Sequence, residues 1–389
     1  MEDNRRNFIK KGASLAAVLS MGGLGACTGT GPNTTGKDDS TQSAKQGAVS
    51  QAQWPIDEGA DTPKLCIGIS SNASEDEMRR VKQIGVDHVL MGGGKMPWTE
   101  SKLRATLDRF KKNGLTVINM MIGGFPNAIY GREGRDEEIK NLQDSLVAAG
   151  AAGLPVVEYN FYADRLMEGY YKKDARGGAT WTAFNYEGVQ NLPPKPEIGK
   201  HTAEELWDNL TYFLKAVIPV AEKAGVRMAL HPNDPPVPVS HGSDQIMATL
   251  ADWKRLIEIV DSPSNGITFD CGVTREIGED PVAVCRYFGS RDRINHSHYR
   301  NVIVDTPRLK YSEVFLDEGQ VNMFEVMKEL IRLKYNRGLF PEHPRGLDND
   351  IGKHVNGYPG GGGYTALTYN IGFAHAMKLA VLSAQGEKS

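Results

Sequence analysis

The regular alternation of short apolar runs with amphipathic stretches limits the fold of this chain more than any other feature. Apolar runs that predict strands lie at 64–70, 88–91, 115–122, 155–162, 227–233, 266–272, 293–301 and 338–346. Helical patterns follow at 75–85, 99–113, 137–152, 202–224, 244–261, 280–288, 322–335 and 365–384. Eight strand–helix units in this order predict an α/β protein with a (β/α)8 TIM barrel.

A doubly wound open sheet is the structural alternative. Glycines such as Gly85, Gly153 and Gly225 end predicted helices just before the next strand, as either fold requires. The first strand, however, is not followed by the glycine-rich turn that holds a dinucleotide in a doubly wound sheet. We therefore expect residues 63–389 to form one TIM-barrel catalytic domain.

The N-terminal residues have the composition of a targeting segment. Arg5-Arg6 is followed by Phe8-Ile9 and two lysines, and an apolar run then leads to Leu24-Gly25-Ala26-Cys27. This resembles a twin-arginine signal peptide over residues 1–26 that ends at a lipoprotein cleavage site, with Cys27 as the lipidated residue. Residues 27–62 are polar and predict a flexible tether. We expect export to the periplasmic side, with the membrane as a partner through a lipid anchor on Cys27.

The net charge and the cysteine content limit the classes of partner and of disulfide pattern that this chain can have. The formal net charge of −3 argues against a nucleic-acid partner, because such proteins usually carry a clustered basic face. A small-molecule ligand fits the composition better, and a homo-oligomer remains open. Beyond Cys27 the chain has Cys66, Cys271 and Cys285, an odd number without the spacing of a disulfide framework.

Metal-ligating residue types stand at the ends of four successive predicted strands. His231 ends the fifth strand, Cys271 the sixth, His298 lies late in the seventh and Glu342 ends the eighth. Chemistry in TIM barrels takes place at these carboxyl ends, and adjacent strands lie about 4.8 Å apart. A set of nitrogen, sulfur and oxygen donors suits Mn²⁺, Fe²⁺, Co²⁺ or Zn²⁺. His296, two residues before His298, faces the same way and is either a rival ligand or a residue that supports a ligand.

Other polar residues near the strand ends are candidates for substrate binding. Asp234 either orients His231, binds a substrate hydroxyl or caps a turn. Arg300 has the geometry to hold a carboxylate through two hydrogen bonds. Tyr159 and Asn160 end the fourth strand and face opposite ways, so at most one of them lines the pocket.

The motifs at these positions resemble those of bacterial mannonate dehydratases. The resemblance rests on His231-Pro232-Asn233-Asp234-Pro235-Pro236, on the strand 266–269 running into Cys271-Gly272, on His298-Tyr299-Arg300-Asn301, on Glu342-His343 and on Gly363-Tyr364. Gly134-Arg135-Asp136-Glu137-Glu138-Ile139 and Tyr159-Asn160-Phe161 also match in type and order. The resemblance covers nearly all of the chain beyond Pro63.

The resemblance implies a metal-dependent dehydratase, a carbon–oxygen lyase that converts D-mannonate to 2-keto-3-deoxy-D-gluconate or acts on a related aldonate. It implies Mn²⁺ or Fe²⁺ as the cofactor, held by His231, Cys271, His298 and Glu342. It also implies that His343 and Tyr364 perform the proton transfers.

Several positions depart from the family pattern. Glu342 stands where the family has aspartate, and Gln245 in 242–246 replaces an arginine suited to an anionic sugar acid. Residues 316–323 lack a histidine and two acids of the family motif. These changes leave the metal ligands in place and alter their surroundings.

Two other functions compete with dehydration. One is a sugar isomerase or epimerase of the xylose-isomerase-like type, although such enzymes usually bind their metal through several carboxylates rather than a cysteine. The other is a lipoprotein that binds a sugar acid without converting it.

Overall fold

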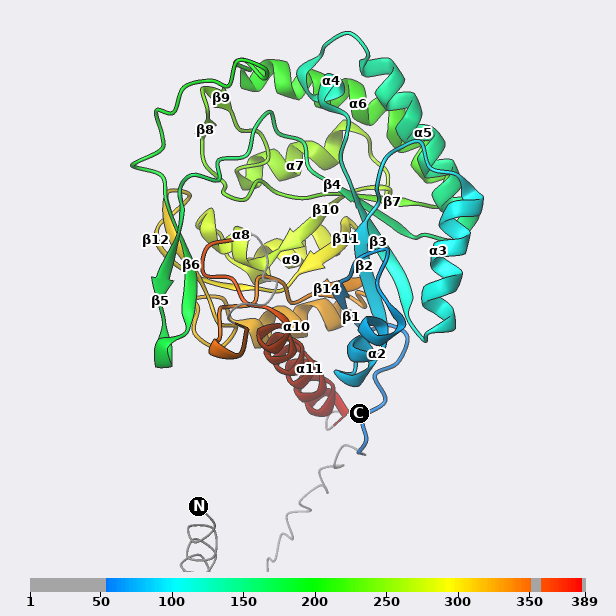
Figure 1. The fold of residues 1–389 in the computed structure, drawn as a ribbon, viewed down its shortest axis with the longest axis vertical. Coiled ribbons are helices and arrows are strands. Elements are labelled where there is room, and N and C mark those ends of the chain that lie inside the picture. The colour runs from blue at the N-terminus through cyan, green and yellow to red at the C-terminus, as the bar shows by residue number, and fades with distance from the viewer. Residues whose placement is uncertain (1–53, 351–357, 387–389) are drawn as a thin grey trace, which may run out of the picture. The chain divides into compact units, whose positions relative to one another are not determined.

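The computed structural model describes residues 54–350 and 358–386, and its centre is a closed barrel of eight parallel strands (Figure 1). Around the barrel the strands follow the order β1-β14-β11-β10-β7-β4-β3-β2. Their bounds are β1 (Lys64–Gly68), β2 (His88–Gly92), β3 (Thr116–Ile122), β4 (Val156–Tyr159), β7 (Arg227–Leu230), β10 (Asn265–Asp270), β11 (Ile294–His298) and β14 (Gly338–Phe340). The predicted TIM barrel is confirmed, and each barrel strand overlaps one of the predicted strands.

Helices surround the barrel, and their apolar sides share one core with it. The main helices are α2 (Glu75–Gln83), α3 (Glu100–Lys112), α5 (Arg135–Ala152), α6 (Ala203–Ala224), α7 (Leu250–Ile259), α9 (Pro281–Gly289), α10 (Met323–Arg332) and α11 (Tyr364–Gly386). Two short helices, α4 (Pro126–Tyr130) and α8 (Cys271–Glu276), lie in the connections after β3 and β10.

A second sheet, which the sequence patterns did not predict, flanks the barrel on the left of Figure 1. Its strands are β5 (Tyr170–Asp174), β6 (Thr180–Asn185), β12 (Asn301–Thr306) and β13 (Lys310–Val314), in the order β12-β13-β6-β5. The two hairpins follow β4 and β11, so both leave the barrel at the carboxyl ends of its strands. Tyr170, Phe184 and Tyr311 pack between them in a small core of their own. A shorter hairpin, β8 (Val239–Ser240) and β9 (Ser243–Asp244), follows β7.

Several predicted boundaries differ from the structure, and two of them have an identifiable local reason. The helix expected from residue 244 begins at Leu250, because Thr249 is its N-cap and accepts a hydrogen bond from the backbone N–H of Asp252. The strand expected over 266–272 ends at Asp270, whose side chain caps the N-terminus of α8 by accepting from the N–H of Val273. Cys271 is therefore the first residue of a helix and not the last residue of a strand.

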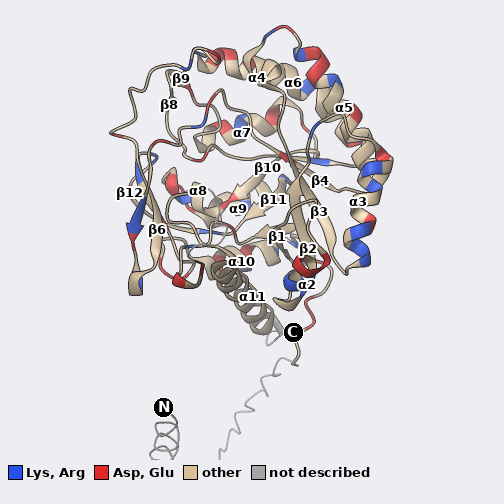
Figure 2. Ribbon diagram, viewed as in Figure 1, with Lys and Arg blue, Asp and Glu red and all other residues tan. Residues whose placement is uncertain are grey.

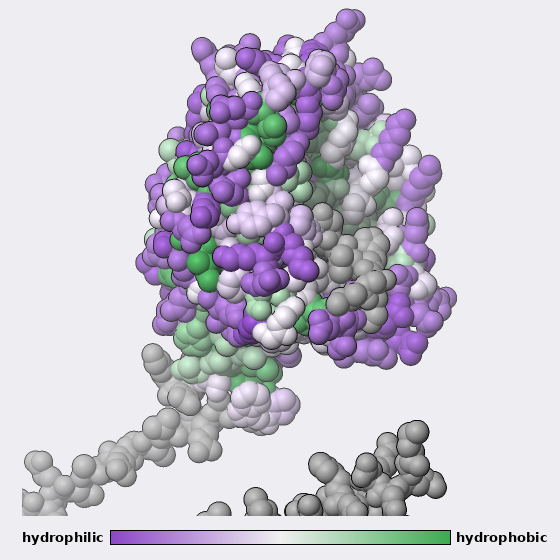
Figure 3. Space-filling view, turned by 60° about the vertical axis from the view of Figure 1, so that its left-hand side comes forward, coloured by the Kyte–Doolittle hydropathy of each residue, from purple (hydrophilic) through white to green (hydrophobic). Residues whose placement is uncertain are grey.

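The outer surface carries charges of both signs. Basic and acidic residues intermingle along α3 and α5 (Figure 2). The face in Figure 3 is mostly hydrophilic, with apolar residues scattered over it. Within residues 54–350 and 358–386, no helix combines the length and the apolar character needed to cross a bilayer.

Two threonine N-caps provide a matched test of the helical layer. Thr202 forms a capping box with Glu205 at the start of α6, where its hydroxyl accepts from the Glu205 N–H. Thr99 precedes α3 without any side-chain cap bond. We expect Thr202→Ala to lower the free energy of unfolding by about 1 kcal/mol and Thr99→Ala to lower it by clearly less, measured by chemical denaturation. Equal losses in the two variants would contradict this assignment.

Candidate active site

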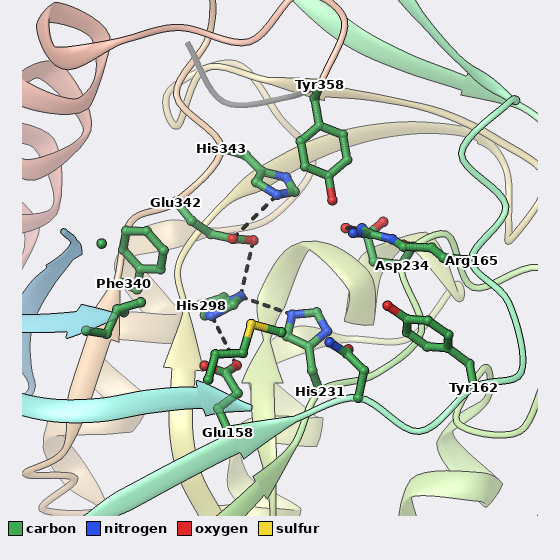
Figure 4. Close-up of a pocket in the computed structure, with 14 residues that line it drawn as sticks. Glu158, Tyr162, Arg165, His231, Asp234, His298, Phe340, Glu342, His343 and Tyr358 are labelled. Atoms are coloured by element: carbon green, nitrogen blue, oxygen red, sulfur yellow. Dashed lines mark hydrogen bonds and ion pairs between the residues drawn. The ribbon is translucent and has the colours of Figure 1, made fainter. Parts of the chain in front are cut away.

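A pocket of about 380 Å³ opens at the carboxyl ends of the barrel strands (Figure 4). Strand ends around the barrel line it, including Gly68 of β1, Glu158 of β4, His298 of β11 and Phe340 of β14. The segments that follow the strands complete its wall. This is the position at which TIM barrels carry their chemistry.

Four donor groups converge on the floor of this pocket. Asp270 and His298 are paired in register on neighbouring strands, which places them at the same level of the barrel. His298 Nδ1 lies 3.1 Å from His231 Nε2, 3.2 Å from Glu342 Oε1 and 3.7 Å from Asp270 Oδ2. One donor atom from each residue lies within 4.8 Å of the others, and the four residues are His231, Asp270, His298 and Glu342.

The geometry of this group fits a divalent metal ion. Ligand atoms about 2.1 Å from a tetrahedral ion lie about 3.4 Å apart, close to the spacings seen here. Glu342 Oε1 is buried and has no hydrogen-bond partner among the described residues, so a cation would satisfy it. His231 Nδ1 lies 2.6 Å from the carbonyl of Pro232, which fixes the proton on Nδ1 and leaves Nε2 as the ligand atom.

Cys271, predicted as a metal ligand, lies outside this group, and Asp270 takes its place. The Cys271 Sγ donates to the carbonyl of Arg300 at 3.2 Å, and burial raises the pKa of the thiol. The reason is register, because neighbouring residues at the end of a strand point to opposite sides. Asp270 points toward the two histidines, whereas Cys271 turns away into α8. The donors that converge are nitrogen and oxygen without sulfur.

Burial and neighbouring charge set the protonation of the group. Burial lowers the pKa of His231, and the nearby His298 lowers it further, so His231 is neutral, which is the form that can bind a metal. Burial also disfavours charge on His298, but Glu342, Glu158 and Asp270 outweigh it and raise the pKa of that imidazole. The pKa of Asp270 is lowered despite burial, mainly by the guanidinium of Arg300.

Glu158 and His296 lie next to this group, and the sequence predicts only His296 of the two as a candidate. Glu158 accepts hydrogen bonds from Asn119 and Thr268, both at 2.7 Å, and its Oε1 is 3.4 Å from His298 Nε2. His298 Nε2 makes no hydrogen bond to this carboxylate, so Glu158 acts on the ring of His298 through its negative charge. His296 is buried, and neither ring nitrogen has a hydrogen-bond partner among the described residues. A carboxylate within the apolar strand 156–159 was the sequence signal for Glu158.

His343 lies beside Glu342 at the pocket wall, as predicted. Its Nδ1 is 2.7 Å from Glu313 Oε2, and its Nε2 is 3.4 Å from Glu342 Oε2. Burial lowers the pKa of His343, but the two carboxylates outweigh it and the net shift is upward. The residue has a φ of 47°, an unfavourable backbone conformation for a side chain of this size that holds the ring toward the pocket. Glu313 belongs to β13, so the unpredicted sheet supplies the group that orients His343.

Tyr364, predicted as the second proton-transfer residue, lies away from the pocket. It is 42% exposed, and its hydroxyl donates to the carbonyl of Arg80 on α2. Tyr358 lines the pocket instead, with its ring centroid 4.7 Å from that of His343 and its hydroxyl directed inward (Figure 4). Burial raises the pKa of Tyr358, so its hydroxyl remains a proton donor. The sequence pattern gave only the nearby Gly363-Tyr364 motif, six residues further along.

Arg300 does not reach the pocket as a carboxylate clamp. It is buried, with Nε 2.9 Å from Asp270 Oδ2 and Nη1 2.7 Å from Glu276 Oε1. Its Nη2 lies 3.3 Å from Asp234 Oδ2. The charge of Arg300 is therefore used to neutralise acids of the protein itself.

Asp234 lines the pocket and is held on several sides. The hydroxyl of Tyr170 donates to its Oδ1 at 2.6 Å, that of Tyr311 at 3.2 Å, and Arg165 Nη2 lies 3.4 Å from Oδ2. Since His231 Nδ1 faces its neighbouring carbonyl, Asp234 does not orient that ring. Its role is to tie the added sheet to the pocket wall.

Tyr159 and Asn160 point to opposite sides, as expected for consecutive residues at the end of a strand. Asn160 lines the pocket, whereas Tyr159 is buried among Phe125 and Phe213. Tyr162 and Arg165, which the sequence did not single out, also line the pocket. The predicted signal peptide, the lipidation site Cys27 and residues 27–53 of the predicted tether lie outside the described residues.

Comparisons with known proteins point to one family. The D-mannonate dehydratase (UxuA) family profile matches residues 197–383. The mannonate dehydratase of Streptococcus equi subsp. zooepidemicus is 33% identical over 248 residues, which cover 57% of this chain and 67% of that protein. The crystal structure of mannonate dehydratase from Streptococcus suis serotype 2 superposes with a TM-score of 0.75 at 27% identity, covering 83% of this chain and 96% of that one. D-psicose 3-epimerase from Clostridium cellulolyticum H10 has a TM-score of 0.54 at 14% identity over 82% of this chain and 99% of that one, which shows a common fold.

The ligand assignment is tested by metal content. We expect Asp270→Asn and His298→Ala to weaken Mn²⁺ binding at least about 10-fold, because each removes a donor from the group. Cys271→Ala should bind the metal as the unchanged protein does, because its sulfur faces the carbonyl of Arg300. Elemental analysis after equilibrium dialysis measures both effects.

A cobalt-loaded sample gives an independent reading. It should lack the near-ultraviolet sulfur-to-metal charge-transfer band of a thiolate ligand. Loss of metal in Cys271→Ala, or such a band in the unchanged protein, would contradict the nitrogen and oxygen donor set.

Proposed function

Because the chain belongs to the mannonate dehydratase family, we propose that it is a hydro-lyase that removes water from D-mannonate or a closely related aldonate. D-mannonate would yield 2-keto-3-deoxy-D-gluconate. The observation that carries the proposal is the metal-binding group of two histidines and two carboxylates beside His343 and Tyr358 in one pocket. Dehydration next to a carboxylate needs both charge stabilisation and proton transfer, and these residues supply the means for each.

We propose Mn²⁺ or Fe²⁺ as the cofactor, held by His231, Asp270, His298 and Glu342. Imidazole and carboxylate donors support this choice, since sulfur would shift the preference toward softer ions. When bound, such an ion would act as a Lewis acid on oxygen atoms of the sugar acid and stabilise negative charge that develops on them during dehydration.

His343 and Tyr358 are the groups positioned to move protons. The reaction breaks the C2–H bond and the C3–O bond, so one group must accept a proton and one must supply a proton to the departing hydroxyl. Glu313 and Glu342 hold His343 in place, and in its neutral form His343 would accept the proton from C2. Burial keeps the Tyr358 hydroxyl protonated, so Tyr358 would supply the proton to the departing hydroxyl. Together they form the proton-handling pair, next to the ligand Glu342.

Product analysis tests the proposal. Protein spanning residues 28–389, loaded with Mn²⁺, should convert D-mannonate to a keto acid that is lighter by one water, measured by a keto-acid assay and mass spectrometry. A screen of other aldonates and uronates identifies the preferred substrate. A product of unchanged mass would indicate an isomerase or epimerase, and binding without any product would indicate a sugar-acid-binding protein.

Two tyrosine variants separate the pocket residue from the one predicted by sequence. We expect Tyr358→Phe and His343→Ala to lower kcat by about 10²–10⁴-fold while metal content stays unchanged, because each removes a proton-transfer group. Tyr364→Phe is the control and should retain nearly full kcat, because its hydroxyl bonds to Arg80. A large loss of kcat in Tyr364→Phe together with a small loss in Tyr358→Phe would identify Tyr364 as the proton-transfer residue instead.

We also propose that the protein is exported through its twin arginine and anchored by lipid on Cys27. The Arg5-Arg6 pair and the small residues before Cys27 support this proposal. A folded, metal-loaded enzyme is compatible with this route, because twin-arginine export carries proteins already folded.

Fractionation of producing cells tests the export proposal. The full-length protein should appear in the membrane fraction and incorporate labelled fatty acid. Cys27→Ser should abolish the labelling. The double substitution Arg5→Lys and Arg6→Lys should block export, so that the precursor stays in the cytoplasm. Unprocessed full-length protein in the cytoplasm of cells making the unchanged chain would refute export.

A further inference from the structure

One arginine that lines the pocket, Arg165, is bound to other residues of the protein along only one edge of its guanidinium. Arg165 follows β4. Of the described residues that line the pocket, Arg165 alone is a lysine or an arginine. Figure 4 shows Arg165 and Tyr162 across the pocket from His298 and Glu342. The pocket therefore has a metal-binding side and a cationic side.

The guanidinium of Arg165 is fixed at one edge and open at the other. Its Nε donates to the backbone carbonyl of Asp234, and its Nη2 lies 3.4 Å from Asp234 Oδ2. Its Nη1 has no hydrogen-bond partner within the described residues, and 30% of the side chain is exposed to solvent. Its Cζ also lies 5.2 Å from the centroid of the Tyr358 ring, which restricts the guanidinium further. The planar guanidinium of Arg165 is thus held in one orientation, and its Nη1 is available to donate hydrogen bonds to a ligand.

Asp234 does not cancel the charge of Arg165 by itself. This carboxylate is shared with Arg300 Nη2 at 3.3 Å and accepts hydrogen bonds from the hydroxyls of Tyr170 and Tyr311. Arg165 therefore retains attraction for a further anion, and that attraction is stronger in a partly buried pocket than in water.

We propose that Arg165 binds the carboxylate of the substrate and thereby makes the enzyme select sugar acids over neutral sugars. The inference rests on the proposed function, because it assigns the anionic end of an aldonate to the cationic side of the same pocket. An arginine fork matches the two oxygens of a carboxylate in plane, which a neutral hydroxymethyl group cannot reproduce. The neighbouring Tyr162 lines the same side of the pocket.

Ligand binding to the Mn²⁺-loaded protein tests the inference without requiring turnover. D-mannonate and D-mannitol differ at C1, where a carboxylate is replaced by a hydroxymethyl group. Isothermal titration calorimetry should show that the unchanged protein prefers D-mannonate. Arg165→Gln should weaken D-mannonate binding roughly 10- to 100-fold, the range for a hydrogen bond between charged groups, and leave D-mannitol binding nearly unchanged.

Two control variants separate recognition from folding. Arg165→Lys should recover part of the preference, because it restores the charge without the fork. Arg79→Gln, on the exposed surface of α2, removes an arginine elsewhere and should leave both affinities unchanged. Melting temperature and metal content should be the same in all variants.

The outcomes distinguish this inference from the proposed function. Selective loss of D-mannonate binding in Arg165→Gln supports the role of Arg165 even if the unchanged protein produces no keto acid, in which case only the dehydratase proposal fails. Equal weakening of both ligands, no weakening of either, or no preference for D-mannonate in the unchanged protein would overturn the inference.

Discussion

The mouth of the barrel is organised by the need to balance buried negative charge. Asp234, Asp270, Glu276 and Glu342 are all buried, and the guanidinium of Arg300 contacts each of them. An unpaired carboxylate at such depth would be very costly, so one arginine fixes the positions of several acids at once. Glu342 Oε1 lies 3.3 Å from Arg300 Nε without a hydrogen bond among the described residues, at the point where two imidazoles also converge. A divalent cation completes this charge balance.

The second sheet, formed by β5, β6, β12 and β13, positions several of the residues that line the pocket. Its strands arise from the connections after β4 and β11, so they fold over the same end of the barrel. Glu313 on β13 orients His343, and Tyr170 and Tyr311 hold Asp234, which in turn fixes Arg165. Positioning of the pocket wall therefore depends on contacts between segments far apart in the sequence.

Barrel geometry explains how much of this could be predicted. Alternating strands and helices place the ends of successive strands together, and His231, His298 and Glu342 were found by that rule alone. The exchange of Asp270 for Cys271 depends on where one strand ends, and a shift of one residue reverses the direction of the side chain. The sheet was missed because most residues of β5 are exposed and its two hairpins lie more than a hundred residues apart in the sequence, so their shared apolar core forms only when the hairpins pair. Tyr358 was missed because only the folded chain brings it to His343.

The central claim is that nitrogen and oxygen atoms alone hold the metal, with Asp270 in the place expected for a thiolate. X-ray absorption spectroscopy at the edge of the bound Mn²⁺ or Fe²⁺ measures this donor set directly in the unmodified protein. The account predicts a first coordination sphere of nitrogen and oxygen at about 2.0–2.2 Å. A sulfur neighbour in the first coordination sphere, at a longer distance than the nitrogen and oxygen neighbours, would contradict it and identify Cys271 as a ligand.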